Sequence, residues 1–440
     1  MNLNFDQNKI CSCGKEHKTL VEHCIVEKGA IRRVPEYAKL YHATKAFIVA
    51  DVNTYPLAGD EITKMLEQDG ISVSKYIFPD EHLEPDEHAV GALALHYDAQ
   101  CNMIIAIGSG VINDISKILA HQTKNPYIIV ATAPSMDGYA SPLSSMARGG
   151  LKVSIPSKCA EVIIGDIDIL KNAPLHMLKA GLGDMLAKYI ALCEWRIGNL
   201  ITGEYYCERI AGLVRTALKK CVDNADGILK RDETAAANVF EGLVICGVAM
   251  SYAGVSRPAS GVEHYFSHVW DMRGLEMGTP VDLHGIQCAI ATLLCAKLYE
   301  QVKKITPDKE KALSYAKAFD FAEWSEELSG FLGKAADTMI VLEKKEQKYN
   351  VEKHQKRLEI ILDNWENILR IIDEEVPASE EIERILSSIE APRSVEEIGI
   401  DGSILPMTLR SAKDIRDKYV LPRLLWDLGV LNEISQSLID

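Results

Sequence analysis

Residues 45–135 alternate between two kinds of segment, and this alternation constrains the fold more than any other feature of the sequence. Four short runs rich in Ile and Val have the composition of buried parallel strands: KAFIVAD, VSKYIF, NMIIAIG and YIIVAT. The segments between them carry apolar residues at helical spacing and begin with acidic residues or proline. This series predicts βαβ units and a doubly wound parallel sheet.

The pattern changes after Pro174. Two more strand-like runs, LKVSIP and AEVIIGDIDIL, precede that residue, whereas residues 174–300 have the pattern of successive helices and residues 306–375 that of charged, amphipathic helices. A chain of 440 residues, 47% of them hydrophobic, is long enough for two domains. We therefore predict an α/β domain over residues 1–170 and an all-helical domain over residues 171–440.

Composition excludes several classes of protein. A formal net charge of -15 disfavours binding to nucleic acid or to an anionic membrane surface. Uninterrupted apolar runs stay shorter than the ~18 residues of a membrane span, and the start, MNLNFDQNKICSCG, lacks the apolar core of a secretory signal. Most of the eleven cysteines lie in apolar runs, as reduced and buried thiols do. We expect a cytoplasmic protein.

The run NMIIAIGSGVINDISKILA combines a strand, a tight glycine turn and a helix. Gly108 and Gly110 let the backbone approach a ligand, and the helix that begins near Val111 directs N–H groups and the positive end of its dipole to the same point. A pyrophosphate suits this arrangement. The G-S-G pattern lacks the third glycine of the usual dinucleotide motif, so a simple turn between strand and helix is the alternative.

Asp51 ends the first clear strand of the series. A carboxylate at the C-terminal end of a strand can accept hydrogen bonds from both hydroxyls of an adenine ribose, and it repels a 2′-phosphate, which favours NAD over NADP. The alternative is an ordinary loop aspartate.

Candidate metal ligands lie in three places of the helical half. We expect Asp184 at the start of one helix, His264 and His268 on one face of a second, and His284 at the start of a third. One carboxylate and two imidazoles from separate helices suit a divalent ion with an open position for a substrate oxygen. A structural histidine or a polar helix face is the alternative. The sequence has no HExxH motif, so a zincin protease is not indicated.

The segment CSCGKEH near the N-terminus contains Cys11, Cys13 and His17 in the spacing C-x-C-x3-H. Soft ligands this close could hold a small zinc knuckle. The spacing differs from the usual Cys-x2-Cys site, so we favour the alternative of a flexible hairpin with free thiols.

Five motifs, GSGVINDISK, TAPSMDGYAS, GLGDMLAKY, SRPASGVEHYFSH and LHGIQ, follow one another along the chain. In this order they resemble the sn-glycerol-1-phosphate dehydrogenases, which belong to the iron-containing (group III) alcohol dehydrogenase superfamily together with glycerol dehydrogenase and dehydroquinate synthase. The resemblance covers residues 20–300 with ordered motifs and the rest more loosely. It implies a Rossmann-like domain that binds NAD(H) or NADP(H), over residues 1–170, and an all-α domain that holds metal and substrate, over residues 171–440.

The resemblance also implies positions for the cofactor. The strand-end ribose carboxylate of the family corresponds to Asp51, and a further cofactor contact to Ser141. The remaining implied contacts lie in the glycine-rich turn and in a segment along the cofactor: Gly108, Ser109, Gly110, Val111, Ile112, Thr132, Ala133, Pro134 and Ser135.

The metal ligands of the family correspond to Asp184, His264 and His284. Some iron-dependent relatives carry an extra histidine four residues after the aspartate, where this chain has Lys188. Three protein ligands then remain, a set that the resemblance links to zinc or nickel as readily as to iron.

The reaction implied by the resemblance is the reversible reduction of dihydroxyacetone phosphate to sn-glycerol 1-phosphate. His268 corresponds to a histidine near the substrate, and Asp137 to an aspartate that contacts it; both are candidates for orienting hydroxyls and passing the proton, next to Asp184 on the metal. For the substrate phosphate the first candidate is Arg257, since guanidinium matches phosphate oxygens. Lys188 and Arg148 are weaker candidates, and a capping or surface role is the alternative for Arg257.

Three other functions stay open on the sequence. They are a glycerol or other polyol dehydrogenase, a lyase similar to dehydroquinate synthase that uses NAD transiently, and a regulator that binds a nucleotide or a metal without catalysis. The run AMSYAGV and the helical half are compatible with a homodimer. The expected partner is a small phosphorylated triose, without nucleic acid and without insertion into a membrane.

Overall fold

The computed structural model describes residues 10–149 and 151–439. The chain divides into two compact units: unit 1 is Met1–Met185 with Gly212–Val255, and unit 2 is Leu186–Ala211 with Ser256–Asp440. Strands give way to helices close to residue 170, but packing also assigns helical residues beyond it to unit 1. The division into domains 1–170 and 171–440 therefore stays a prediction. Residues 1–9, on which the expected absence of a signal sequence rests, lie outside the described part.

Unit 1 is built on a six-stranded sheet in which every neighbouring pair is parallel, as the βαβ series predicted. In spatial order the strands are β1 (His23–Glu27), β8 (Val162–Asp166), β5 (Tyr127–Ala131), β4 (Met103–Gly108), β2 (Lys45–Asp51) and β3 (Ser72–Phe78). A separate antiparallel pair is formed by β6 (Leu143–Arg148) and β7 (Leu151–Pro156). The strands β1 and β6 were not predicted, because HCIVE is very short and LSSMAR is largely polar.

The strand order reverses between β2 and β4. From β2 the chain runs to β3 on one side, and it then returns to β4, β5 and β8 on the other. In open parallel sheets ligands bind beyond the carboxyl ends of the strands at such a reversal. The pairing of Val49 with Ala106 places the ends of β2 and β4, Asp51 and Gly108, at the same level of the sheet.

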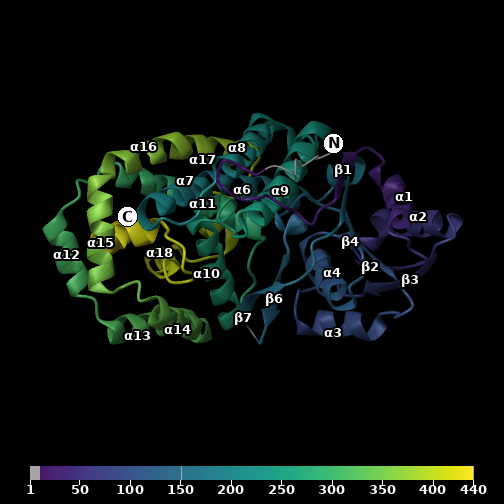
Figure 1. Cartoon of the computed structure of the whole chain (residues 1–440), viewed down its shortest axis with the longest axis horizontal. Helices are drawn as coiled ribbons and strands as arrows, with labels where there is room; N and C mark the ends of the chain where they lie inside the picture. Colours follow the sequence, from purple (N-terminus) through teal and green to yellow (C-terminus); the bar gives the residue numbers. More distant parts are fainter. Residues whose placement is uncertain (1–9, 150, 440) are drawn as a thin grey trace. The chain divides into compact units, whose positions relative to one another are not determined.

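Helices cover both faces of this sheet. One face of β2, β4, β5 and β8 packs against helices α1 and α2, and α4 packs against β4 and β2 (Figure 1). The helices assigned wholly or mainly to unit 1 are α1 (Val34–Leu40), α2 (Tyr55–Gln68), α3 (Glu87–His96), α4 (Gly110–Thr123), α5 (Ile167–Leu170), α6 (Leu175–Leu186), α8 (Glu208–Asp223) and α9 (Glu233–Ala253).

Helix α9 is the one described helix that is long and apolar enough to cross a membrane, at a mean hydropathy of 1.4. Its apolar window is 61% buried inside the protein. A glycine of the neighbouring strand leaves room for it, since a Cβ on Gly165 would lie 2.3 Å from a ring carbon of Phe240. Its burial against β8 is that of a core helix.

The described residues of unit 2 form helices joined by loops, without a strand. Its helices are α7 (Lys188–Thr202), α10 (Val262–Met277), α11 (His284–Val302), α12 (Lys309–Lys317), α13 (Phe321–Leu332), α14 (Ala336–Glu346), α15 (Val351–Asp363), α16 (Trp365–Glu375), α17 (Ser379–Ser388), α18 (Leu405–Ala412), α19 (Leu421–Asp427) and α20 (Leu431–Gln436). The parallel sheet followed by a helical region is the predicted fold class.

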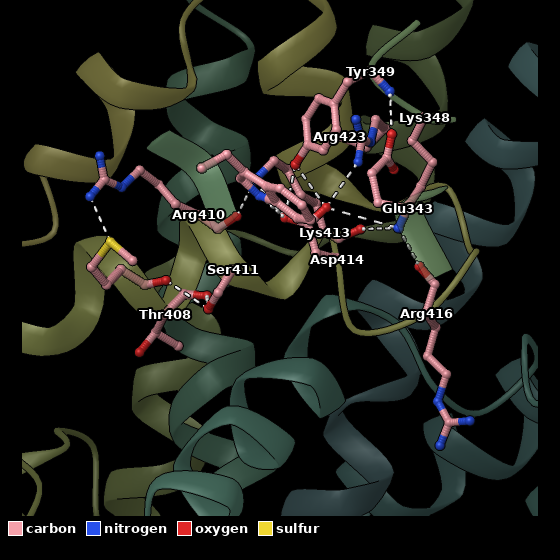
Figure 2. A network of polar contacts seen from close by, with 12 residues as sticks. Glu343, Lys348, Tyr349, Thr408, Arg410, Ser411, Lys413, Asp414, Arg416 and Arg423 are labelled. Atoms are coloured by element: carbon pink, nitrogen blue, oxygen red, sulfur yellow. Dashed lines mark hydrogen bonds and ion pairs between the residues drawn. The ribbon is translucent and has the colours of Figure 1, made fainter. Parts of the chain in front are cut away.

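A buried polar network joins the turn after α14 to the loop between α18 and α19 (Figure 2). Asp414 lies at its centre; the hydroxyl of Tyr349 donates to its carboxylate and lies 2.8 Å from each oxygen, and Lys413 and Arg423 donate to it at 3.0 and 3.3 Å. Lys348 donates to the carbonyl of Lys413 at 3.3 Å. These bonds fix the start of a loop, residues 413–420, whose other end reaches the candidate site.

Candidate active site

The turn between β4 and α4 has the geometry that the glycine pattern predicted. α4 begins at Gly110 after Ser109, and the side chain of Ser109 makes no capping hydrogen bond to the first N–H groups of the helix. A Cβ on Gly108 would lie 2.5 Å from the Cβ of Ile112, so this glycine is needed for close packing of strand and helix. A Cβ on Gly110 would only touch Met136, at 3.5 Å. The first turn of α4 thus directs its N–H groups to the reversal point of the sheet.

The segment after β5 is fastened to this turn. The N–H of Thr132 donates to the carbonyl of Gly108 at 3.1 Å, and the hydroxyls of Ser109 and Ser135 are 2.6 Å apart. Tyr139 is fully buried and donates to the carbonyl of Ala133 at 2.6 Å. The predicted cofactor segment, residues 132–135, therefore lies beside the glycine turn.

The next residues, 137–141, are held by α4. Lys117 is fully buried, and its ammonium donates to the carbonyls of Gly138 at 3.3 Å and Ser141 at 3.4 Å. Asn113 donates to the carbonyl of Gly138 at 3.2 Å. These two polar residues of α4 were missed on the sequence, where their helical spacing alone gave no signal. They fix the loop that carries the candidate Asp137.

Two glycines let helices approach the same loop. A Cβ on Gly181 in α6 would lie 1.8 Å from the carbonyl oxygen of Pro134. A Cβ on Gly247 in α9 would lie 2.8 Å from the Cβ of Ala140 and 3.0 Å from the carbonyl oxygen of Asp137. The loop is therefore enclosed by α4, α6 and α9, and side chains at either glycine would displace it.

Asp51 forms the turn after β2. Its Oδ1 accepts hydrogen bonds from the N–H groups of Asn53 and Thr54, each at 2.8 Å, and its own N–H donates to the hydroxyl of Thr54 at 3.1 Å. The side chain is half-buried. One oxygen is thus committed to the turn, and Oδ2 is the oxygen through which this carboxylate can bind a ligand.

Asp184 lies near the end of α6 and not at the start of a helix, so that prediction was wrong. The helical pattern GLGDMLAKYIA is interrupted at Ala187, between α6 and α7. Asp184 is fully buried, and its Oδ2 accepts a 2.9 Å hydrogen bond from the N–H of Asp137. The bond fixes the orientation of the carboxylate relative to the loop 132–141.

Unit 2 brings the predicted histidines together. His284 is the first residue of α11, as expected, and His264 lies in the first turn of α10; their ring centroids are 4.9 Å apart. His268, one turn after His264, stacks on His284 at 5.9 Å with an interplanar angle of 16°. The thiol of Cys288 lies 3.5 Å from Nε2 of His284. The cysteine was missed because its i+4 spacing from His284 lies inside an apolar helix.

Neighbours fix the orientation of both imidazoles. Nδ1 of His264 is 2.8 Å from Oε1 of Glu263, and Nδ1 of His284 is 2.8 Å from the hydroxyl of Ser267. Where Nδ1 carries the proton and donates it, Nε2 keeps its lone pair, which is the state in which an imidazole binds a metal. His264, His284 and Cys288 form a group whose ligand atoms lie within 4.8 Å of one another.

Burial raises the pKa of two carboxyl groups that lie at the start of α10. Burial raises the pKa of Glu263 above its usual range. It also raises the pKa of Glu194, and the charge of Glu263 raises it further. Both carboxyls accept backbone N–H groups at the start of α10: Glu194 from Val262 at 2.9 Å and Glu263 from Gly261 at 2.7 Å. The two acidic groups therefore cap the helix that carries His264.

The loop before α10 is held by cations. Arg257 is 2% exposed; its Nε donates to Glu204 at 2.7 Å and its Nη2 to the carbonyl of Tyr419 at 2.9 Å. Its Nη1 is buried and has no hydrogen-bond partner among the described residues. Lys188 donates to the carbonyl of Ala259 at 3.0 Å and Lys418 to that of Ser260 at 2.9 Å. Arg148, the other weaker candidate for phosphate, is exposed on β6.

Comparison with known proteins identifies the family. The model of the iron-containing alcohol dehydrogenases matches residues 25–174. A glycerol-1-phosphate dehydrogenase [NAD(P)+] of Methanosarcina mazei is 35% identical over 300 residues, which cover 68% of this chain and 81% of that protein. The protein of the same name from Halalkalibacterium halodurans is 29% identical, over 93% of this chain and 94% of that one. This chain belongs to the sn-glycerol-1-phosphate dehydrogenase family.

Solved structures of other dehydrogenases have the same fold as this chain. Glycerol dehydrogenase from Schizosaccharomyces pombe is 18% identical, with a TM-score of 0.59 over 95% of this chain and 90% of that chain. Alcohol dehydrogenase from Oenococcus oeni is 14% identical, with a TM-score of 0.61 over 96% and 99%. The α/β sheet followed by a helical region is thus the architecture of the iron-containing alcohol dehydrogenases, as the five motifs implied.

Proposed function

We propose that this chain catalyses the reversible, metal-dependent reduction of dihydroxyacetone phosphate to sn-glycerol 1-phosphate with NADH or NADPH. Membership of the glycerol-1-phosphate dehydrogenase family supports the reaction. One structural observation carries it: the N–H of Asp137 donates to Asp184 at 2.9 Å. Through this bond, the loop that leaves the proposed cofactor segment orients a carboxylate proposed to bind the metal. The polyol dehydrogenase, lyase and regulator alternatives are not favoured.

The cofactor is proposed to lie across the reversal point of the sheet. The uncapped start of α4, at Gly110, Val111 and Ile112, receives the pyrophosphate, with Gly108 and Ser109 forming the turn before it. The segment Thr132–Ser135 and Ser141 line the cofactor, and Oδ2 of Asp51 accepts from the ribose hydroxyls. When bound, the nicotinamide ring carries the hydride. Because a carboxylate at Asp51 repels a 2′-phosphate, we infer a preference for NADH.

Asp184, His264 and His284 are proposed to hold one divalent ion: zinc, nickel or iron. Their donor set suits such an ion: a buried carboxylate with one oxygen oriented by a backbone N–H, and two imidazoles whose Nδ1 atoms have their own partners. When bound, the ion supplies Lewis acidity to a substrate oxygen. Glu263 contributes by accepting a hydrogen bond from Nδ1–H of His264, which leaves the lone pair on Nε2.

The remaining residues act on the substrate hydroxyls and the phosphate. His268 and Asp137 are proposed to orient the hydroxyls and to accept or return the proton of the C2 oxygen, directly or through water. For the phosphate we propose Nη1 of Arg257, which carries two N–H groups and is buried without a hydrogen-bond partner among the described residues. Its Nε and Nη2 donate to Glu204 and to the carbonyl of Tyr419. These bonds orient the guanidinium and leave Nη1 available for the phosphate.

The decisive experiment measures NADH oxidation with dihydroxyacetone phosphate, followed by chiral assignment of the product. We expect turnover with the phosphorylated ketone, little with dihydroxyacetone, and sn-glycerol 1-phosphate as the product. Preference for dihydroxyacetone would instead indicate a glycerol dehydrogenase. Turnover of a substrate without net consumption of NADH would indicate a lyase, and bound NADH without any turnover would indicate a regulator.

The metal assignment has its own measurement. Chelation should abolish activity, and one divalent ion should restore it. His264→Ala and His284→Ala should lower the bound metal, and Glu263→Gln should weaken it about 10–100-fold, because an orienting carboxylate is lost. Full metal occupancy in both histidine variants contradicts the assignment. Cys288→Ser tests in the same assay whether the thiol beside His284 contributes a ligand.

The assembly and location of the protein are also proposals. A homodimer in the cytoplasm fits a metabolic oxidoreductase of acidic net charge -15. Sedimentation of the purified chain distinguishes a dimer from a monomer.

A further inference from the structure

The N-terminal segment CSCGKEH folds as a tight hairpin in unit 1. Ile10 pairs with Glu16 in an antiparallel bridge, and the N–H of Cys11 donates to the carbonyl of Lys15 at 3.0 Å. The N–H of Gly14 returns to the carbonyl of Cys11 at 2.9 Å, and Gly14 has a φ of 82°, which favours glycine at the tip. The hairpin predicted for this segment is therefore present.

The hairpin brings three soft ligands together. The ligand atoms of Cys11, Cys13 and His17 lie within 4.8 Å of one another. Cys11 and His17 are each 5% exposed, while Cys13 is half-buried. Cys11 and His17 lie on the two arms of the hairpin and Cys13 lies in its turn, so the hairpin brings the three donors together.

The distances match a tetrahedral zinc site. The thiol of Cys13 lies 3.5 Å from Nε2 of His17. A zinc ion with a Zn–S bond of about 2.3 Å and a Zn–N bond of about 2.0–2.1 Å separates the two donor atoms by about 3.5–3.6 Å at the tetrahedral angle.

A backbone carbonyl orients the histidine. Nδ1 of His17 lies 3.3 Å from the carbonyl oxygen of Tyr252, in the last turn of α9, and the ring of Tyr252 lies 5.5 Å from that of His17. Metal-binding histidines donate their second ring N–H to such a partner, which leaves the lone pair on the ligating nitrogen. The same bond explains why Nε2 faces the thiols.

We propose that Cys11, Cys13 and His17 bind one zinc ion through two thiolates and Nε2. Both thiols lose their protons to solvent when the ion binds, so the two thiolates balance the charge of Zn²⁺ and the buried site is neutral. Water or one further side chain takes the fourth position. The site is separate from the proposed catalytic metal and does not rest on the proposed function.

The zinc site would act on the structure of unit 1. It ties the N-terminal hairpin to the C-terminal end of α9 through His17 and Tyr252. The same helix packs at Gly247 against the loop of Asp137, and Ser251 donates to the carbonyl of Ala140 at 3.3 Å. Binding of the ion therefore stabilises the helix against which that loop is packed.

The first test counts metal and identifies thiolate ligation. The full chain is prepared with Co²⁺ in the Cys288→Ser background, so that a thiolate-to-cobalt charge-transfer absorption cannot come from the thiol beside His284. We expect this absorption, and we expect Cys13→Ser to abolish it with the loss of one metal ion per chain. Cys101→Ser, the same change at a buried cysteine outside the hairpin, should keep both. Unchanged metal content in Cys13→Ser, or no thiolate absorption before it, overturns the proposal.

A second test needs no variant. The wild-type protein, loaded with zinc, is treated with iodoacetamide before and after chelation, and the modified cysteines are identified by peptide mapping. Cys13 is half-buried and should react at least tenfold faster after the chelator removes the ion. Equal labelling of Cys13 in both states contradicts a zinc–thiolate bond, whatever the chelator does to catalysis.

Discussion

Gly181 lies so close to Pro134 that a Cβ on residue 181 would sit 1.8 Å from the carbonyl oxygen of that proline. Gly181→Ala should therefore push α6 away from the loop after β5 and destabilise the protein by at least about 2 kcal/mol, the cost of overpacking a rigid backbone contact. Denaturant unfolding measures the loss. Gly212→Ala is the matched control, since its Cβ meets nothing within 4 Å in helix α8, and it should stabilise by up to about 1 kcal/mol. Equal stabilities would refute the contact.

Gly110→Val should weaken NADH binding at least tenfold while the fold is kept. A Cβ at residue 110 makes only an ordinary 3.5 Å contact with Met136, so the substitution is tolerated by the protein, but its branched side chain occupies the space proposed for the pyrophosphate. Fluorescence titration with NADH gives the affinity, and thermal unfolding checks the fold. Gly91→Val adds the same side chain to α3, where a Cβ meets nothing within 4 Å, and should leave NADH affinity unchanged. An unaltered affinity in Gly110→Val removes the turn from the cofactor site.

Asp51→Asn should shift the preference from NADH towards NADPH. The amide oxygen can still accept the N–H groups of Asn53 and Thr54, so the turn after β2 is kept while the charge is lost. A charged hydrogen bond to the ribose is worth roughly 1.5–3 kcal/mol, so NADH affinity should fall about one to two decades. Removal of the repulsion should leave NADPH affinity equal or improved. Parallel titrations with both cofactors measure the ratio; an equal loss for both would give Asp51 a purely structural role.

Arg257→Ala should have two separable effects. Arg257 is buried but its partner Glu204 is 26% exposed, so loss of the ion pair should destabilise by less than the about 3–5 kcal/mol of a fully buried pair. In addition the Michaelis constant for dihydroxyacetone phosphate should rise about one to two decades, with little change in the poor turnover of dihydroxyacetone.

Glu204→Gln separates these two effects. The variant weakens the same ion pair, whose Nε–Oε2 distance is 2.7 Å, but it leaves Nη1 of Arg257 in place. It should lower stability without the rise in the Michaelis constant. If both variants impair the two substrates equally, Arg257 is structural and the phosphate is held elsewhere.

Lys348 should make the free energy of unfolding depend on pH. Its side chain is 12% exposed, and burial lowers its pKa from 10.5 to about 8. Because the pKa is lower in the folded state, the contribution of Lys348 to stability is present above the unfolded pKa and is lost as the pH falls from about 10.5 to about 8, with no further loss below. Lys348→Met should flatten this slope. Denaturant unfolding at a series of pH values, taken as the difference between wild type and variant, isolates this lysine; parallel curves would contradict the prediction.

Much of the fold was visible in the sequence because strands buried on both faces need continuous apolar runs. KAFIVAD became β2 with the predicted limits, and the G-S-G turn follows β4. The roles of residues that depend on long-range packing could not be predicted from the sequence. Gly181 and Gly247 lie inside helical patterns and reveal their purpose only through the loop they touch. The break of helix at Ala187 had no proline or glycine to mark it, so Asp184 was assigned to the wrong end of a helix.

In the candidate site too, local sequence predicted some features, whereas features set by long-range packing could not be predicted. Local spacing was sufficient to predict that His264 and His268 share a helical face and that His284 opens a helix, and the structure places the rings of His264 and His284 4.9 Å apart. The residues that orient them, Glu263 and Ser267, stand in the same motif but carry no signal by themselves. The burial of Arg257 and its ion pair could not be predicted, because its partner Glu204 is distant in sequence.

The hydrogen bond from the Asp137 N–H to Asp184 has a thermodynamic consequence for the affinities of cofactor and metal. The donor belongs to the loop proposed to line the cofactor, and the acceptor is a proposed metal ligand. A ligand that fixes the loop also fixes the carboxylate, so the ordering entropy lost in the first binding event is not lost again in the second. By reciprocity, the metal must tighten NADH by the same factor by which NADH tightens the metal. The metal-free enzyme should therefore bind NADH more weakly than the loaded enzyme, and the affinity for the metal should rise by the same factor when NADH is present.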